Sequence, residues 1–151
     1  MIKIICVGKV KEKYLVDAIN EYVKRLSKYT KINIIEVSDF DNSNKDIVLS
    51  KEKELIKKYI DEKDYVITLE IEGNMLSSEE LANKIDNIFI SNSNIVFIIG
   101  GSYGLHQDIK KRSNYKLSFS KLTFPHQLFR VNLLEQIYRS YKINNNESYH
   151  K

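Results

Sequence analysis

The sequence predicts one α/β domain with a mostly parallel sheet and flanking helices. Short apolar runs typical of strands alternate with amphipathic helical segments along the whole chain, which is the pattern of parallel sheets. Apolar residues make up 42% and charged residues 29%, ordinary values for a globular protein. A length of 151 residues fits one domain, and no repeat or linker divides it. We therefore treat residues 1–151 as a single domain.

The first half of the chain contains three expected strands and two expected helices. Leu15, Ile19 and Leu26 recur at the 3.6-residue period of a helix. A polar stretch and a segment rich in lysine and glutamate predict a loop and a second helix. The elements in order are strand 2–7, helix 13–29, strand 32–37, loop 39–44, helix 47–60 and strand 65–71, with a turn at Gly73.

The second half begins with a helix start signal. Ser77 and Glu80 have the spacing of a capping box, and the helix is expected to run to about Phe89. Ile95–Ile99 is continuously apolar, as expected of a parallel strand covered on both faces. The remaining elements are a glycine loop at 100–104, a short helix near 107–111, a strand at 115–118 and a helix from Pro125 to about Ile143.

The last helix is apolar around much of its girth. Such a helix is usually buried on two sides, one against the sheet and one against another element or another subunit. Burial within one protomer is the alternative to a dimer. The two apolar stripes are Leu128, Val131, Leu134 and Tyr138, and Phe129, Leu133, Ile137 and Tyr141.

Charge and cysteine usage limit the function classes. From Asp108 to Lys151 there are nine Lys/Arg against three acids, whereas the other residues hold 15 against 17. A basic third suggests an anionic partner, nucleic acid first, although a solvated lysine-rich surface is the alternative. Cys6, the only cysteine, lies in an apolar run and is expected to be a buried hydrophobe. Neither a signal peptide nor a membrane span is expected, which favours the cytoplasm.

Ligands of open α/β sheets bind beyond the carboxyl ends of the strands. Three such ends stand out, at 69–73, 99–104 and 118–124. The glycines of the middle segment match neither the dinucleotide pattern nor a P-loop. The three histidines and one cysteine have no metal-ligand spacing, and no serine lies in a nucleophile elbow. We therefore expect no metal site and no covalent hydrolase mechanism.

These segments together resemble the RlmH family of SPOUT-class enzymes, which methylate N3 of a pseudouridine in large-subunit (23S) ribosomal RNA. The resemblance runs from the first strand to the last residue. The matching segments are Phe97–Leu105, Arg112–Gln127, Glu135–Arg139 and the terminal Tyr149–Lys151. The alternatives are a non-enzymatic ribosome- or RNA-binding protein, and a SPOUT methyltransferase that acts on another RNA such as tRNA.

The resemblance implies a C-terminal trefoil knot, a homodimer packed through the last helix, and S-adenosylmethionine as methyl donor. It implies an active-site role for Arg139, Tyr149 and His150: the arginine would stabilise the acceptor anion, and the terminal pair would close over the site. A frayed tail is the alternative for the terminal pair. The implied cofactor-binding residues are Leu69, Gly100, Phe119, Ser120, Lys121, Leu122, Thr123 and Phe124, for some of which plain core packing is the alternative.

The RNA partner is expected to be the assembled ribosome. Lys110, Lys111 and Arg112 form a basic run expected to contact phosphates. His126 follows a proline at a helix start, and we expect it to have a structural or local hydrogen-bonding role. Without an added RNA-binding domain, a large preshaped substrate would supply much of the recognition surface.

Overall fold

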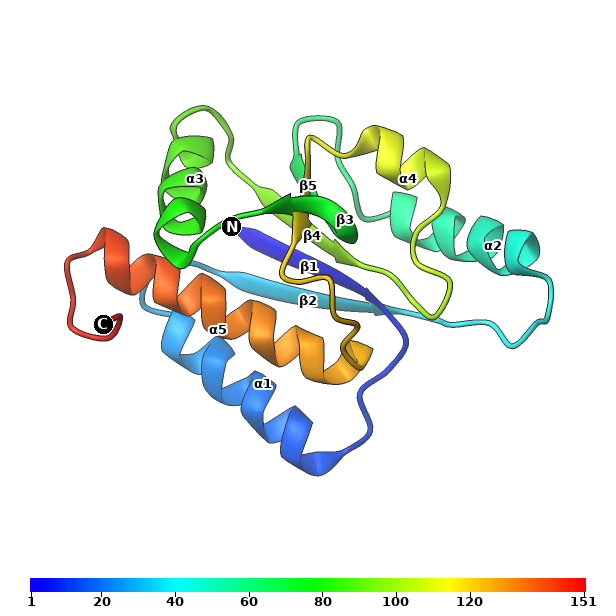
Figure 1. The fold of residues 1–151 in the computed structure, drawn as a ribbon, viewed down its shortest axis with the longest axis horizontal. Helices are drawn as coiled ribbons and strands as arrows, with labels where there is room; N and C mark the ends of the chain where they lie inside the picture. Colours follow the sequence, from blue (N-terminus) through cyan, green and yellow to red (C-terminus); the bar gives the residue numbers. More distant parts are fainter.

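The computed structural model describes residues 1–151 and contains a five-stranded, all-parallel sheet in the order β2-β1-β4-β3-β5 (Figure 1). The prediction of an α/β domain with a parallel sheet is confirmed. The elements are β1 (Ile2–Val7), α1 (Lys13–Leu26), β2 (Ile32–Val37), α2 (Lys45–Lys57), β3 (Tyr65–Met75), α3 (Ser78–Ser91), β4 (Ile95–Ile99), α4 (Gln107–Arg112), β5 (Tyr115–Ser118) and α5 (His126–Asn144).

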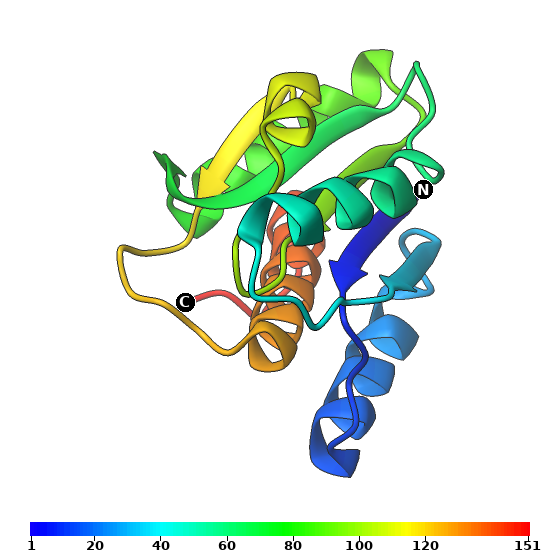
Figure 2. The same ribbon diagram turned by 90° about the vertical axis from the view of Figure 1, so that its right-hand side faces the viewer.

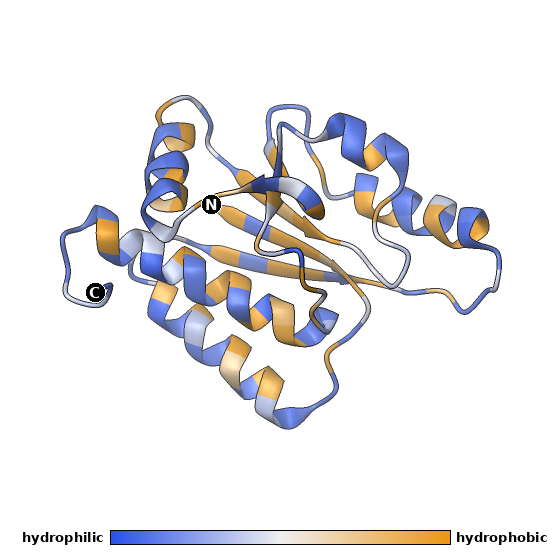
Figure 3. Ribbon diagram, viewed as in Figure 1, coloured by the Kyte–Doolittle hydropathy of each residue, from blue (hydrophilic) through white to orange (hydrophobic).

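The helices cover the two faces of the sheet unequally. Helices α1, α3 and α5 pack on one face around Phe97, and α2 and α4 pack on the other around Ile98. Figure 2 shows α5 running beneath the sheet beside α1, and Figure 3 shows the apolar strands between these layers. Because successive side chains of a strand point to opposite faces, both faces of β4 must be apolar. Cys6 is fully buried here, as expected.

Local capping explains where two helices begin. The Ser77 hydroxyl accepts from the Glu80 amide and the Glu80 carboxylate accepts from the Ser77 amide, which confirms the capping box. Helix α2 begins at Lys45, two residues before the predicted start. The reason is Asn44, whose side chain accepts from the amides of Asp46 and Ile47. No helix is both long and apolar enough to cross a membrane.

Strand β3 is longer than predicted because it contains a bulge. Leu117 of β5 is in register with both Leu69 and Asn74, so the intervening residues 70–73 leave the ladder. The predicted turn at Gly73 is therefore wrong. A β-carbon there would lie 2.8 Å from the Lys116 carbonyl oxygen, so the strands pass too closely for a side chain. The expected trefoil knot stays a prediction with which the strand order is consistent.

Helix α5 draws its buried residues from both predicted stripes. Leu133, Leu134 and Ile137 are fully buried against α1, α3 and the sheet within one protomer. The protomer itself buries the middle of each stripe, and the expected homodimer stays a prediction. Leu128, at 40% exposed, and the half-buried Phe129, Val131 and Tyr141 are the members of the stripes that stay partly accessible.

A buried arginine connects α5 to the strand ends. The Arg130 side chain is 1% exposed, and one guanidinium nitrogen donates to the carbonyls of Val7 and Gly8 at 3.1 and 2.8 Å. The other terminal nitrogen donates to the Glu36 carboxylate at 2.7 Å, and the Val10 amide donates to the same oxygen. Four segments, α5, β1, β2 and the loop after β1, therefore meet at one ion pair.

We expect Glu36→Ala to lower the free energy of unfolding by about 3 kcal/mol, because it leaves a buried guanidinium without its counter-charge. Urea denaturation at pH 7 measures the change. The matched control is Asp17→Ala, which removes the exposed Lys13–Asp17 pair; it should change stability by less than about 0.5 kcal/mol. Equal effects of the two substitutions would contradict the anchoring role of Arg130.

Candidate active site

A cavity of about 450 Å³ lies at the carboxyl ends of β3, β4 and β5. The structure brings seven of the eight residues predicted to bind the cofactor into its lining, and leaves Lys121 outside. These seven are Leu69, Gly100, Phe119, Ser120, Leu122, Thr123 and Phe124. We call this the first cavity. Its volume falls within the range of small-molecule sites.

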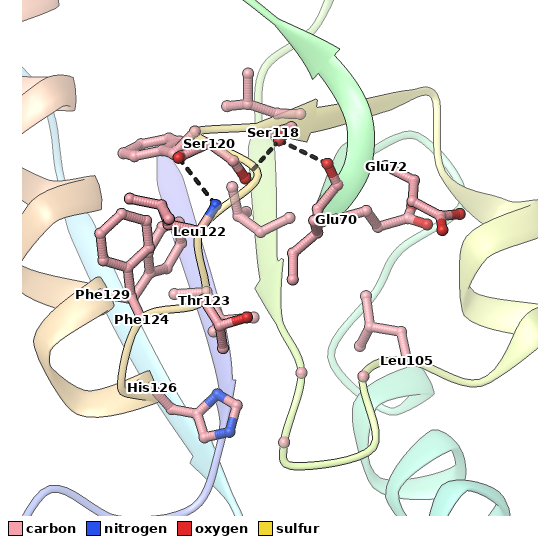
Figure 4. A pocket seen from close by; sticks show the side chains of 18 of the residues that line it. Glu70, Glu72, Leu105, Ser118, Ser120, Leu122, Thr123, Phe124, His126 and Phe129 are labelled. Carbon is pink, nitrogen blue, oxygen red and sulfur yellow. Dashed lines mark hydrogen bonds between the residues drawn. The ribbon is translucent and has the colours of Figure 1, made fainter.

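The first cavity has one aromatic wall and one acidic wall. Phe129 of α5 packs edge-to-face on Phe119, with ring centroids 4.8 Å apart, and lies 5.9 Å from Phe124. Figure 4 shows the Phe124 and Phe129 rings across the cavity from Glu70 and Glu72 of the β3 bulge. The Glu70 carboxylate accepts from the Thr68 hydroxyl at 2.6 Å and pairs with Lys110 at 3.8 Å. The bulge thus creates a wall that a regular strand would not provide.

The glycine loop closes on itself at the base of this cavity. The Gly104 amide donates to the Gly101 carbonyl, and Gly104 has a φ of 78°, in the left-handed region. A β-carbon on Gly100 would lie 2.5 Å from the Gly104 carbonyl oxygen. The loop geometry itself therefore demands glycine at 100. A side chain there would break the loop as well as narrow the cavity.

The three predicted active-site residues form a second group, centred on Glu135. The Glu135 carboxylate accepts from the Arg139 guanidinium at 2.8 and 3.3 Å and from the Tyr149 hydroxyl at 2.8 Å. The bond to Glu135 raises the pKa of Arg139, and burial together with Glu135 raises that of Tyr149. Arg139 also lies 4.8 Å from the centre of the Tyr149 ring. We call Glu135, Arg139, Tyr149 and His150 the tail cluster.

The end of the chain is not frayed. The Tyr149 ring packs edge-to-face on Tyr138 at 5.0 Å, and Glu147 accepts from Tyr29 and Lys142. His150 is held on both sides: Arg139 lies 3.1 Å from Nδ1 and Glu79 lies 2.6 Å from Nε2. Because a guanidinium can only donate, Nδ1 is the acceptor and the ring proton sits on Nε2, facing the Glu79 carboxylate.

The first cavity and the tail cluster are separate within one protomer. Phe129 lines the cavity and Arg139 belongs to the cluster, and no residue of the cluster lines the cavity. Ten helical residues separate the two positions on α5, about 15 Å along the axis. The sequence suggested one assembled site, whereas the tail cluster of one protomer lies outside its first cavity, farther along α5.

The three residues expected to contact RNA differ in their availability. Arg112 donates to the carbonyls of Asp61, Glu62 and Asp64, so its guanidinium fastens the turn before β3. Lys110 lines the first cavity and forms an ion pair with Glu70. Lys111 is exposed and makes no ion pair, which leaves it available to a phosphate.

A second cavity, of about 470 Å³, contains residues that the sequence analysis missed. It lies between the loops after β1 and β4, and its lining includes Lys9, Asp39 and Glu52. Burial and nearby Asp39 raise the pKa of Glu52 from 4.5 to about 7. His126 lines both cavities without a hydrogen-bond partner, so the expected local bond is absent; burial and Arg130 lower its pKa. The sequence did contain a signal for this cavity, because Gly8 and Lys9 follow the first strand and mark a fourth strand end at which a ligand could bind.

No three His, Cys, Asp or Glu side chains are placed to hold a metal ion.

Comparison with known proteins identifies close relatives. A family described as predicted SPOUT methyltransferases matches residues 1–150. The chain is 59% identical to a ribosomal RNA large subunit methyltransferase H of Clostridium botulinum and 58% identical to a putative one of Methanococcus vannielii. Each alignment covers 99% of both chains.

The fold also has a counterpart among solved structures. A probable methylase family protein from Haemophilus influenzae superposes with a TM-score of 0.58, over 99% of this chain and 70% of that one. The sequence identity is 15%, so this likeness shows the fold alone.

The raised pKa of Glu52 predicts a pH-dependent cost to stability. The folded protein holds this proton more tightly than the unfolded chain, so Glu52 lowers stability progressively as pH rises from about 4.5 through 7. Glu52→Gln removes the titration, so its gain over the wild type should grow between pH 5 and pH 8, by roughly 2 kcal/mol. Urea denaturation at the two pH values measures this gain.

The control is Glu54→Gln, on the same helix with its side chain 67% exposed, which should show no such pH dependence. A Glu52→Gln effect that is the same at both pH values would mean that the buried carboxyl does not titrate in this range.

Proposed function

The chain belongs to the SPOUT methyltransferase family and, within it, to the group named ribosomal RNA large subunit methyltransferase H. From this membership we propose its reaction. The protein transfers a methyl group from S-adenosylmethionine to N3 of a pseudouridine in 23S ribosomal RNA, on the assembled ribosome in the cytoplasm. The observation that carries the proposal is the first cavity, which gathers seven of the residues that the family resemblance assigns to the cofactor.

The first cavity suits a cofactor with an aromatic ring and a charged end. Leu69, Ile99 and Leu122 offer apolar surface to the faces of an adenine, and the closed glycine loop offers backbone groups to its edge. Glu70 and Glu72 place negative charge on the wall opposite the aromatic rings. When bound, S-adenosylmethionine supplies an activated methyl group, so the work of the chain is alignment and electrostatics.

The tail cluster suits the acceptor base. The ring nitrogen of the acceptor loses a proton as it is methylated, and negative charge develops on the neighbouring carbonyl oxygens. Arg139 presents a fixed guanidinium that can stabilise this charge, because Glu135 orients it through two hydrogen bonds. His150 carries a lone pair on Nδ1 that now accepts from Arg139. If the Nη1 group of Arg139, which Glu135 does not hold, donates to the acceptor instead, Nδ1 is released to take up a proton.

A homodimer brings these two halves together. In a two-fold dimer built on α5, the first cavity of one protomer can face the tail cluster of the other. Leu122, 70% exposed, and Leu128, 40% exposed, are the apolar groups near the cavity that such a contact would cover. The names of the relatives favour ribosomal RNA over transfer RNA. They also favour an enzyme over a binding protein without activity.

The function is tested with purified protein, S-adenosylmethionine and ribosomes from a strain lacking the enzyme. We expect mass spectrometry to find one N3-methylpseudouridine in 23S RNA and none in transfer RNA. Leu122→Ala should weaken cofactor binding about tenfold in calorimetry, since burying a leucine contributes about 1.5–3 kcal/mol. Ile90→Ala, at a residue 81% exposed on α3, is the control and should bind normally. Unmethylated ribosomes would refute the function.

The shared site is tested with mixed dimers. Thr123→Trp fills the first cavity and Arg139→Ala removes the guanidinium, so each homodimer should be inactive. A heterodimer of the two variants carries one intact cavity opposite one intact tail cluster, and it should regain about half of the wild-type activity. Single-turnover methylation of ribosomes by differently tagged, co-purified subunits measures this. A heterodimer as inactive as its parents would place cavity and cluster in the same protomer.

A further inference from the structure

The second cavity lies at the topological switch point of the sheet. Strands β1 and β4 are neighbours, but the chain leaves β1 toward β2 on one side and leaves β4 toward β5 on the other. Ligands of open α/β sheets bind where such connections diverge. The loop after β1 supplies Gly8 and Lys9 to this cavity, and the loop after β4 supplies Ser102 and Tyr103. The fold therefore leaves a hollow in the place where this architecture takes ligands.

Glu52 is a buried acid that lacks a partner and lines this hollow. It is 5% exposed, its carboxylate makes no hydrogen bond or ion pair within the protein, and its oxygens are open to the cavity. The other buried charges are paired, Lys3 with Asp64 and Arg130 with Glu36. A β-carbon on Gly101 would lie 3.4 Å from Glu52 Oε2, so the carboxylate packs directly against the glycine loop. A largely buried carboxyl without a protein partner is poorly solvated, so the arrangement fits a ligand in the cavity that donates hydrogen bonds to it.

The lining indicates the chemistry of that ligand. Glu12, Asp39, Asp41 and Glu52 outnumber Lys9 and Lys11, so the interior disfavours an anion. Carboxylates accept hydrogen bonds from ring N–H and amino groups, and Phe40 and Tyr103 offer aromatic faces for stacking. The two lysines are exposed, where they can meet groups outside the cavity. These side chains fit a ligand whose uncharged heterocycle lies inside the cavity and whose anionic groups lie outside it.

The two cavities adjoin each other. Gly101, Ser102 and His126 line both, and a ring in the second cavity would therefore lie beside a molecule in the first. Burial and Arg130 lower the pKa of His126, which keeps its imidazole neutral at pH 7 between them. Because the tail cluster takes the acceptor base itself, a neighbouring base turned out of its stack is the substrate group that fits this place.

We propose that the second cavity receives a nucleobase of the RNA substrate, whose N–H groups donate to Glu52 and Asp39 while Lys9 and Lys11 contact the flanking phosphates. This inference rests on the proposed function, because it takes ribosomal RNA as the substrate. It adds a binding site that shares the loop after β4 with the first cavity and takes most of its other residues from the loops after β1 and β2 and from α2.

Photo-crosslinking tests whether RNA enters the cavity. The photoreactive residue p-benzoylphenylalanine replaces Tyr103, which is 41% exposed and lines the cavity. In the control it replaces Tyr59, which is 42% exposed in the turn after α2. We expect the label at 103, but not at 59, to crosslink 23S RNA of intact ribosomes within a few nucleotides of the methylated position, mapped by reverse transcription. No crosslink at 103, or equal crosslinking at both, would overturn the proposal.

Kinetics test the role of the carboxyl. Glu52→Gln replaces an acceptor oxygen by an amide nitrogen, so we expect the half-saturating ribosome concentration to rise at least tenfold while S-adenosylmethionine affinity is unchanged. Glu54→Gln should behave as the wild type. Normal ribosome saturation by Glu52→Gln would remove Glu52 from recognition and overturn the inference. A wild-type protein that methylates no ribosome would instead refute the proposed function, and the crosslinks, which need no catalysis, would still report on the cavity.

Discussion

The buried guanidinium of Arg130 holds the ends of several elements in one place. Its bonds to Val7, Gly8 and Glu36 fix the first turns of α5 against the carboxyl ends of β1 and β2. The helix in turn places Phe129 in the wall of the first cavity and His126 between the two cavities. A charge removed from water requires good geometry at every partner, so this pair leaves little freedom to the segments that it joins. Both cavities depend on that rigidity.

Close backbone packing shapes the first cavity as much as its side chains do. The glycine loop folds back so tightly that Gly100 meets Gly104, and the β3 bulge passes so near β5 that position 73 has no room for a side chain. Ser118 then fastens the bulge by donating to the Ile71 carbonyl at 2.8 Å. Irregular backbone of this kind costs stability, and functional sites are where such costs are commonly retained.

The distribution of charge follows a similar logic. The tail cluster pairs the Arg139 guanidinium with the Glu135 carboxylate, so the protein itself orients this side chain. Glu52 is buried without a partner, and its raised pKa marks the free energy of that burial. Paired groups are preorganised, whereas an unpaired buried group gains from a ligand. The protein thus contains one site already satisfied by its own residues and one that is not.

The sequence by itself determined the elements of this protein and the segments that meet at the first cavity. Apolar periodicity located β4 to the residue, the Ser77–Glu80 spacing located the start of α3, and the resemblance named seven residues that share one cavity. These features are local or carried by contiguous motifs, so they can be read without the fold. Helix α2 began early because a single asparagine caps it.

The tertiary structure alone decided how distant segments meet. The β3 bulge depends on the proximity of Lys116, the burial of Leu133 and Ile137 depends on α1 and α3, and the partners of Arg130 lie more than 90 residues away. The separation of the first cavity from the tail cluster, and the unpaired state of Glu52, likewise follow from the packing. Contacts between residues far apart in sequence leave no periodic or compositional signal, because they are fixed by the three-dimensional path of the chain.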